Sequence, residues 1–440
     1  MSRTRPVAAL ALLALLAGAP AASGAWRAPC VPGAKRPVCT WWRAKATFIA
    51  DGDTIRARIA GIPGVSTVRF TGINAMELTR YSARASRRRG ACHGVAATAV
   101  VQHAIRRAHG RIRLAAQRPA SQTGGRVRRS VYARIGGAWV DVARLVLDRG
   151  LALWLPNPVE WAHNLEYRFV SDVSAALHRG LYDPVACGVG PDQDLPLSAT
   201  VNWDADGNDE RNLNGEWVEV FNGGGRDLPL DGWWVRDSWL DYGARHLPGY
   251  AFPAGARIPP GGVVRVHVGC GADTPTDFHW CRRSSAFENV THDRRQLGDG
   301  GYLFDPQGDL RAAMIYPCLA PCRDPLQGAV RISVHPSAPE LIRITNVGTG
   351  LVDLRPYLLE LHVLGERDHF AWSQRFGGGA QLAPGETMRI SPGGRPADDT
   401  RLSRHLGRGA YVLADRGGAL DLRSYADAVV DCVSWGSGRC

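Results

Sequence analysis

The chain has few of the features that mark membrane proteins and zinc proteins. Beyond the N-terminal segment it has no apolar run approaching the roughly 20 residues that a membrane helix needs. It has no Cys-x-x-Cys pair, and His93, His103 and His163 fit no metal-ligand spacing, so the pattern does not indicate a zinc site. Lysine is nearly absent, since Lys35 and Lys45 are the only two among 53 basic residues. Arginine therefore supplies almost all of the positive charge.

The N-terminal segment predicts export. Arg3 and Arg5 precede a short apolar run, and small residues follow up to residue 25. This order is typical of a cleaved secretory signal over residues 1–25, and the apolar run is too short to cross a bilayer. The mature protein is expected to begin near Trp26 and to be secreted into the extracellular space.

The cysteine count agrees with export. Ten cysteines are an even number, and in an exported chain they are expected to form disulfides. Spacing alone does not determine the connectivity. The pairs we consider are Cys30–Cys39, Cys92–Cys187, Cys270–Cys281, Cys318–Cys322 and Cys432–Cys440.

Charge is distributed unevenly along the chain. Residues 41–187 hold 23 Arg and Lys against 9 Asp and Glu, whereas the residues after 187 hold 25 against 32. A basic domain attracts polyanions and gains affinity by releasing their counterions. DNA and RNA are therefore the expected partners of residues 41–187, with Arg87 and Arg88 as candidate phosphate contacts.

Two segments of this basic region carry the residue types that phosphodiester chemistry needs. The first is Asp51 to Thr54, where Asp-Gly is typical of a hairpin turn and places Asp53 at the start of a strand. The second runs from Val68 to Glu77, and strand alternation turns Arg69 away from its apolar neighbours. Read alone, the two aspartates are ordinary turn residues. The downstream arginine and carboxylate favour a site instead.

These segments resemble the staphylococcal nuclease (thermonuclease) family over residues 41–187. The resemblance covers Asp51-Gly52-Asp53-Thr54, the stretch from Arg69 to Glu77, an arginine before the strand at Val131, and a final helix followed by Gly180-Leu181-Tyr182. It implies a five-stranded barrel of the OB type with three helices. It also implies cleavage of DNA and RNA that leaves 3′-phosphate ends.

The resemblance also implies a calcium site. Asp53 and Asn74 would be ligands through their side chains, and Ala75 would be a third through its carbonyl. Calcium takes oxygen ligands of these kinds. The family usually has aspartate where this chain has Asn74, so one negative charge is missing and weaker binding or a changed ion preference is expected.

The remaining roles fall to three residues. Glu77 would orient or deprotonate the attacking water, while Arg69 and Arg129 would hold the phosphate and stabilise its developing charge. The loop before the second arginine departs from the family pattern, so the role is open between Arg128 and Arg129, and spacing to the following strand favours Arg129. Arg126 and Arg128 are then expected to bind nucleic acid.

The helices expected in this region are three. Residues 93–109 have helical composition, a short helix near Val142 is stopped by Gly150, and residues 158–178 form the last helix. The last helix has an apolar stripe that is expected to face the core. Its members are Trp161, Leu165, Phe169, Val173 and Leu177.

After a Gly/Pro-rich linker at 188–197 the composition is that of an all-β protein. Residues 198–322 resemble the lamin-tail domain, an immunoglobulin-like β-sandwich, in the order of their Trp-rich strands and Pro-Gly turns. Residues 328–440 repeat this pattern more weakly and are expected to form a second, diverged sandwich. The predicted fold is therefore mainly β and multidomain.

Two classes of function fit these expectations. The first is a secreted calcium-dependent nuclease whose sandwiches contact a cell surface, a protein partner or substrate. The second is a catalytically degenerate secreted protein that binds nucleic acid or adheres to surfaces. Asn74 and the altered arginine loop favour the second slightly, whereas Asp53, Arg69 and Glu77 favour the first more.

Overall fold

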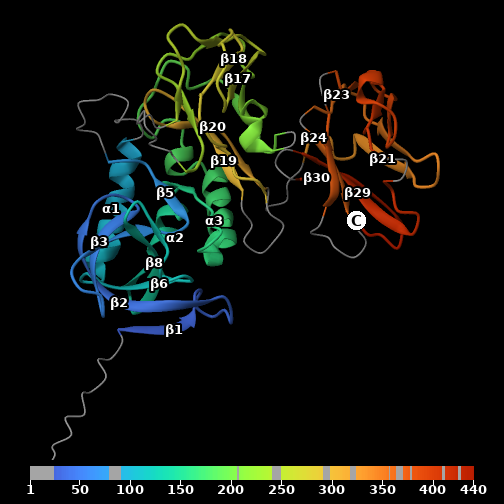
Figure 1. Cartoon of the computed structure of the whole chain (residues 1–440). Coiled ribbons are helices and arrows are strands. Elements are labelled where there is room, and N and C mark those ends of the chain that lie inside the picture. Colours follow the sequence, from blue (N-terminus) through green and yellow to red (C-terminus); the bar gives the residue numbers. More distant parts are fainter. Residues whose placement is uncertain are drawn as a thin grey trace, which may run out of the picture.

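The computed structural model describes residues 24–78, 91–205, 208–239, 249–290, 298–317, 324–355, 357–362, 370–376, 379–408, 412–424 and 428–440. The chain is mainly β and has three parts, which Figure 1 shows from blue through green to red. We call them the barrel (β1 to η3, residues 25–182), the middle sandwich (β11–β20, residues 197–316) and the C-terminal sandwich (β21–β30, residues 330–436). The predicted signal segment and the Cys318–Cys322 pair lie outside the described residues, apart from the last two positions of the signal.

The barrel is closed by five strands in the order β2-β3-β4-β8-β6, with β6 pairing back onto β2. The β4–β8 pair is parallel and the other four are antiparallel. The predicted five-stranded barrel is thus confirmed. Its strands, with the short ones that extend it, are β1 Ala25–Pro29, β2 Val38–Ile49, β3 Thr54–Ile59, β4 Ser66–Phe70, β5 Ile73–Ala75, β6 Arg111–Ala116, β7 Gln122–Thr123, β8 Arg126–Ile135, β9 Ala138–Asp141 and β10 Ala152–Trp154.

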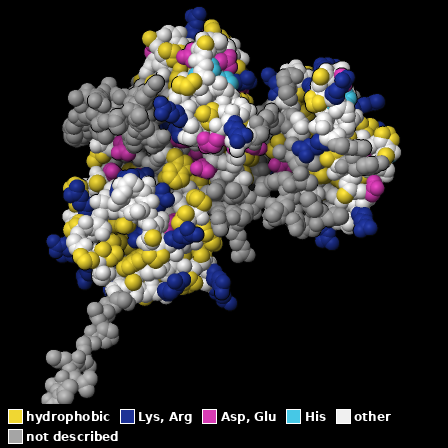
Figure 2. All heavy atoms as spheres, in the orientation of Figure 1, with side chains coloured by type: hydrophobic (Ala, Val, Ile, Leu, Met, Phe, Trp, Pro, Cys, Tyr) yellow, Lys and Arg dark blue, Asp and Glu magenta, His cyan; other side chains and the backbone are white. Residues whose placement is uncertain are grey.

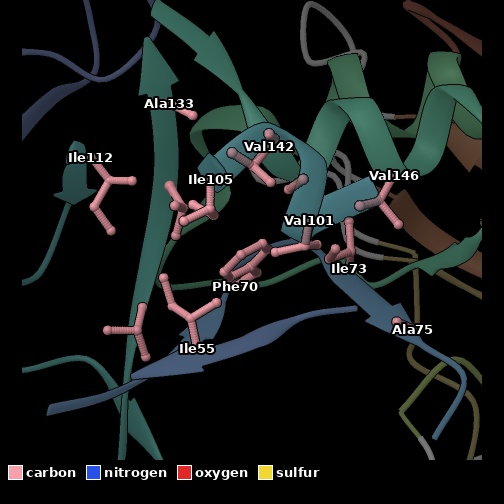
Figure 3. Close-up of a cluster of buried hydrophobic side chains, with 14 of the residues drawn as sticks. Ile55, Phe70, Ile73, Ala75, Val101, Ile105, Ile112, Ala133, Val142 and Val146 are labelled. Carbon is pink, nitrogen blue, oxygen red and sulfur yellow. The ribbon is translucent and has the colours of Figure 1, made fainter. Parts of the chain in front are cut away.

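The barrel core follows from strand alternation. Ile55 and Ile59 of β3 are buried while Arg56 is exposed, as the sequence predicts. Figure 3 shows Ile55 and Phe70 pointing toward Val101 from the helix above them. Burial of this cluster against the helices fixes the end of the barrel where Asp53 and Ile73 lie.

Three helices cover the barrel, as expected: α1 Ala91–Arg107, α2 Val142–Asp148 and α3 Asn164–Ala176, with short 3-10 turns η2 Trp161–His163 and η3 Gly180–Tyr182. The predicted apolar stripe of the last helix is wrong. Leu165, Phe169 and Leu177 are 44, 61 and 54 % exposed. The buried face of α3 carries Tyr167 and Ser174, because hydroxyls that bond to Asp141 Oδ2 and Leu147 O dock it onto α2.

The middle sandwich has two four-stranded sheets, β11-β12-β17-β18 and β15-β14-β19-β20, and a two-stranded β13-β16 pair. Its apolar core joins residues of both sheets. Its elements are β11 Leu197–Asn202, η4 Asp209–Arg211, η5 Leu213–Gly215, β12 Trp217–Asn222, β13 Leu228–Pro229, β14 Trp234–Arg236, β15 Tyr250–Ala251, β16 Arg257–Ile258, β17 Val263–His267, β18 Asp277–His279, β19 Asp299–Phe304 and β20 Leu310–Tyr316.

The C-terminal sandwich repeats this topology, with sheets β21-β22-β27-β28, β25-β24-β29-β30 and β23-β26. The repeat extends to side chains: Asn222 donates to Arg226 O in the turn that follows and to Ile258 O of β16, and Asn346 donates to the matching carbonyls of Gly350 and Leu382. Its elements are β21 Val330–His335, β22 Leu341–Asn346, β23 Val352–Asp353, β24 Tyr357–His362, β25 Phe370–Arg375, β26 Gln381–Leu382, β27 Thr387–Ser391, η6 Pro396–Asp398, β28 Ser403–His405, β29 Gly417–Ser424 and β30 Val429–Gly436.

The barrel and the middle sandwich share an apolar cluster, which we call the junction core. Met76, Leu153, Leu181 and Tyr182 of the barrel pack with Trp234, Tyr302, Phe304 and Leu310 of the sandwich. Polar contacts surround it: His93 Nε2 lies 2.7 Å from Asp309 Oδ1, and Arg168 Nη2 donates to Ile315 O at 2.7 Å. The two parts therefore pack as one body at this boundary.

Four disulfides join described cysteines: Cys30–Cys39, Cys92–Cys187, Cys270–Cys281 and Cys432–Cys440. Each is a pair that the sequence suggested. Cys92 lies in the first turn of α1 and Cys187 follows η3, so this bond joins the start of α1 to the end of the barrel part, beside Asp309. Among the described residues, no helix combines the length and the apolar character that crossing a membrane requires. Both findings are compatible with an extracellular protein.

Glu216 makes the stability of the middle sandwich dependent on pH. Burial raises the pKa of its carboxyl to about 8, and the charges of Asp209 and Glu210 add to the rise. Between its ordinary value of 4.5 and about 8 the folded state binds a proton that the unfolded state has lost. The protonated Glu216 carboxyl therefore keeps the middle sandwich at its full stability at low pH, and the free energy of unfolding falls as pH rises through this window.

We predict that Glu216→Gln, which resembles the protonated carboxyl, gains thermal stability relative to wild type as pH rises from about 4.5 to about 8. The measurement is the unfolding midpoint of both proteins across this range. A constant difference between the two proteins at every pH would contradict the prediction.

Candidate functional site

The two motif aspartates lie at one end of the barrel, in the turn between β2 and β3. Asp51 Oδ1 accepts the N–H of Asp53 at 3.0 Å, and Asp53 itself is buried. Glycine at position 52 is required by packing, since a Cβ there would lie 2.5 Å from Ala97 Cβ of α1 and 2.8 Å from Ala75 Cβ of β5. Gly52 thus lets the turn press against both elements, which fixes the direction of the two carboxylates.

Glu77 is positioned by a second glycine. A Cβ at Gly94 of α1 would lie 2.7 Å from Met76 O and 2.8 Å from Glu77 O, so only glycine lets this segment cross the helix so closely. The Glu77 side chain is partly exposed. Its charge is near enough to Asp51 to raise that carboxyl's pKa.

The carboxylates form an electrostatically strained group. The pKa of Asp51 is raised to about 7, first by burial, then by the negative charge of Asp53 and further by that of Glu77, with Arg69 opposing. A carboxyl perturbed in this way at one end of a barrel is a candidate functional group. The arrangement has an excess of negative charge that a cation would relieve.

Arg69 links this acidic group to the residues of β5. Its guanidinium forms an ion pair with Asp53 Oδ1 and donates to Asn74 Oδ1 at 2.9 Å. Asp53 Oδ2 accepts the N–H of Ala75 at 2.7 Å, and Thr54 Oγ1 donates to Asp53 Oδ1 at 2.9 Å. Asp53, Asn74, Ala75 and Arg69 are therefore brought together, as the sequence expected.

Asn74 also contacts the middle sandwich. Its amide Nδ2 donates to Ser238 O at 2.7 Å and to Trp239 O at 3.2 Å. A carboxylate at this position would place an oxygen against two carbonyl oxygens, whereas an amide offers them N–H groups. This contact gives a physical reason for an amide, and not a carboxylate, at position 74.

A cavity of about 340 Å³ opens on the other side of Arg69, between the barrel and the middle sandwich. Three of its arginines, Arg69, Arg126 and Arg128, come from the barrel, and Arg282 comes from the sandwich. No acidic residue lines it among the described residues. The full lining is Arg69, Phe70, Thr71, Gly72, Thr123, Arg126, Arg128, Leu155, Asn157, Trp239 and Arg282.

The cavity is rich in hydrogen-bond donors. The buried hydroxyl of Thr71 and the indole N–H of Trp239 have no hydrogen-bond partner among the described residues. The pKa of Arg128 is lowered, first by burial and then by the positive charge of Arg69, with Arg126 adding to it. Donors and concentrated positive charge suit a phosphate group.

Strand register places Arg128, and not Arg129, in this cavity. On the parallel strands β4 and β8, Arg69 lies opposite Arg128 and Phe70 opposite Arg129. Arg129 shares the inward direction of Val131 two residues on, because side chains alternate along a strand. Its guanidinium stacks on Trp42 at 4.7 Å and donates to Arg128 O at 2.6 Å and Pro119 O at 2.8 Å.

Arg129 is thus committed to holding the barrel wall, and Arg128 occupies the position that the sequence analysis gave to Arg129. The alternation of Val131 and Ala133 was the available signal. Arg87 and Arg88 lie outside the described residues. Figure 2 shows further Lys and Arg side chains around the barrel on the visible face.

Local sequence pattern did not assign a site role to three residues that line the cavity or lie beside the acidic group. Asp51 was visible in the motif, and its role appears only from its burial and its charged neighbours. Trp239 and Arg282 lie in the middle sandwich, far along the chain from the barrel, and no local pattern marks them.

The residues fit a calcium ion in donor chemistry. Asp53 Oδ1 and Asn74 Oδ1 both meet the Arg69 guanidinium, so a positive charge already lies between two oxygens. A cation held there would share these oxygens with Arg69. Among the described residues, a second group of potential metal ligands is Cys92, His93, Cys187 and Asp309, whose ligand atoms lie within 4.8 Å of one another. Its two sulfurs are bonded to each other, so it offers no thiolate.

Comparison with known proteins identifies the middle sandwich. Residues 198–317 match the Lamin Tail Domain family model. A search of the curated proteins gave no match. The lamin-tail resemblance of this segment is thereby confirmed, and the cavity lies where the lamin-tail domain meets the barrel. The likeness of the barrel to the nuclease family rests on its motifs and topology.

We predict that Arg129→Ala lowers the stability of the barrel by on the order of 3 kcal/mol, because buried carbonyls lose their donors. Arg128→Ala is expected to change stability by less than about 1 kcal/mol and to weaken nucleic-acid binding instead. Unfolding midpoints and oligonucleotide affinity separate the two. Equal destabilisation by both changes would contradict the assignment.

We also predict that Asn74→Asp weakens the contact with the lamin-tail domain, so that without calcium the free energy of unfolding falls by on the order of 2 kcal/mol and the unfolding midpoint falls with it. Added calcium should raise the midpoint of the variant more than that of wild type, because the extra charge faces the ion. A variant as stable as wild type in chelator would remove the structural reason given for Asn74.

Proposed function

We propose that the chain is an exported, calcium-dependent nuclease that hydrolyses phosphodiester bonds of DNA and RNA. One observation carries the proposal: Arg69 forms an ion pair with Asp53, close to Asp51, and also lines a cavity that is rich in hydrogen-bond donors. A phosphodiester in the cavity would therefore meet guanidinium groups, and Arg69 would connect it to the carboxylates of Asp51 and Asp53 behind that side chain. The closed five-stranded barrel, with its one parallel pair at β4–β8, supports an assignment to the OB type and with it the same proposal.

The residues divide the chemistry among them. Arg69 and Arg128 hold the non-bridging phosphate oxygens and stabilise their charge as the attacking oxygen adds. Glu77, partly exposed beside the acidic group, accepts a proton from water. Asp53, Asn74 and the Ala75 carbonyl would hold a calcium ion, which would supply polarisation of a phosphoryl oxygen. By the resemblance, cleavage leaves 3′-phosphate ends.

A second candidate function is nucleic-acid binding without cleavage, or surface adhesion by the sandwiches. Both polar atoms of Asn74 are already used, Oδ1 by Arg69 and Nδ2 by the lamin-tail domain, and this favours a binder. The cavity and its arginines serve binding equally well. Asp51 and Asp53 hold the turn and Arg69 in either case, whereas the partly exposed Glu77 would only repel phosphate in a binder of polyanions, and so Glu77 favours the nuclease.

The test is digestion of plasmid DNA and of RNA by the purified full chain, with calcium or with a chelator. We predict digestion that requires calcium and that Glu77→Gln slows by at least about 100-fold, since a general base contributes at least this much. Glu219→Gln, the same change beside Arg265 on the lamin-tail domain, is the matched control and should digest like wild type.

The products separate the alternatives further. End-labelled fragments that carry 3′-phosphate support the proposed reaction. Retention of nucleic acid with no cutting at any calcium concentration would support the binder and refute the nuclease.

A further inference from the structure

The lamin-tail domain contributes two side chains to the cavity, Trp239 and Arg282, and both are held in place by rigid backbone. Ser238, which precedes Trp239, is fully buried; its N–H donates to Asp299 Oδ1 at 3.0 Å. Its carbonyl accepts from Asn74 Nδ2 at 2.7 Å and from Arg236 Nη2 at 3.1 Å. The position of Trp239 over the cavity is therefore fixed from both domains.

Arg282 is anchored with equal firmness. Its N–H donates to Val268 O at 2.8 Å, and the preceding Cys281 is bonded to Cys270 and donates to Gly269 O at 3.0 Å. Its guanidinium lies 4.9 Å from the centre of the Trp280 ring and 3.9 Å from Asp237 Oδ2. The side chain thus reaches the cavity from a backbone segment that a disulfide and two hydrogen bonds hold in place.

Arg282 is a positively charged residue in an acidic part of the chain. The chain after residue 187 is acidic overall, with 25 Arg and Lys against 32 Asp and Glu. Yet the charged residue that this part places in the cavity is Arg282, which adds to three arginines of the barrel. Like charges at one cavity repel each other, and an anionic ligand removes that repulsion.

Trp239 adds an aromatic surface. The Arg128 guanidinium lies 5.8 Å from its ring centre, and its indole N–H has no partner among the described residues. Alternation of aromatic surface and arginine is how proteins bind single-stranded nucleic acids, because unpaired bases stack and phosphates pair with guanidinium groups. A cavity of about 340 Å³ accommodates a splayed nucleotide and not a duplex.

We propose that the lamin-tail domain is part of the substrate site: Arg282 pairs with a phosphate and Trp239 stacks on an unpaired base of a single strand that crosses the barrel. The inference rests on the proposed function and extends it to the second domain. Arg69 and Arg128 contact the nucleic-acid strand on one side, and Trp239 and Arg282 contact it on the other. The two domains then act as one binding surface.

The test measures binding of a fluorescent single-stranded oligonucleotide to the full chain in chelator, so that no cleavage occurs. Trp239→Ala should weaken binding by about ten-fold with an unchanged salt dependence, since stacking carries no charge. Arg282→Ala should weaken binding by about ten-fold and flatten the slope of log affinity against log salt by about 0.7. Trp239→Phe should keep most of the affinity.

Matched controls on the same domain are Trp217→Ala, a tryptophan of β12 under Arg265, and Arg257→Ala, an exposed arginine of β16. Both lie outside the cavity lining and should bind like wild type. Duplex DNA of the same sequence should respond less to Trp239→Ala than the single strand does.

The outcomes distinguish this inference from the nuclease proposal. Weakened binding by both variants, with unchanged unfolding midpoints, supports the inference even if wild type cuts nothing. Wild-type binding by both variants, while Arg128→Ala loses affinity, would overturn it and leave the nuclease untouched. Failure of wild type to bind any single strand would overturn it as well. With calcium, the supporting result is a raised KM at unchanged kcat, because neither residue touches the reacting atoms.

Discussion

The junction core is the interaction on which the candidate site depends. Met76 and Leu153 on the barrel side pack with Trp234 and Phe304 on the lamin-tail side. Burying such side chains removes apolar surface from water at about 25 cal/mol per Å². The polar contacts around the core, from His93 to Asp309 and from Arg168 to Ile315 O, are directional and set the angle at which the two parts meet. Without this packing Arg282 would have no common space with Arg69 and Arg128.

Arg69 separates two opposed electrostatic environments. On one side, burial and then the negative charges of Asp53 and Glu77 raise the pKa of Asp51, and Arg69 opposes this rise. On the other side, burial and then the positive charges of Arg69 and Arg126 lower the pKa of Arg128. Each side disfavours its own charges and favours a ligand of the opposite sign. A cation and a phosphate bound together would satisfy both.

The sequence predicted the parts of the molecule that local pattern determines. Alternation along β3, the glycine hairpin between β8 and β9, and the motif that brings Asp53, Arg69 and Asn74 together all follow from neighbouring residues. The exposure of Phe169 could not be read in this way, because hydroxyls of Tyr167 and Ser174 decide which face of α3 docks. The same limit hid Trp239 and Arg282, whose place depends on packing between domains. Spacing favoured Arg129 over Arg128 for the phosphate role, but the alternation of Val131 and Ala133 turns Arg129 inward and leaves Arg128 to line the cavity.

The bond between Cys92 and Cys187 links the architecture to the compartment in which the chain matures. It spans 95 residues and ends beside Asp309, the residue that meets His93 across the domain boundary. By chain entropy, closing a loop of this length stabilises the folded barrel by about 4–5 kcal/mol. Thiols stay reduced in the cytosol and pair after export. Under the proposed export this bond forms only after the chain has left the cytosol, so the contact between the barrel and the lamin-tail domain is most stable outside the cell.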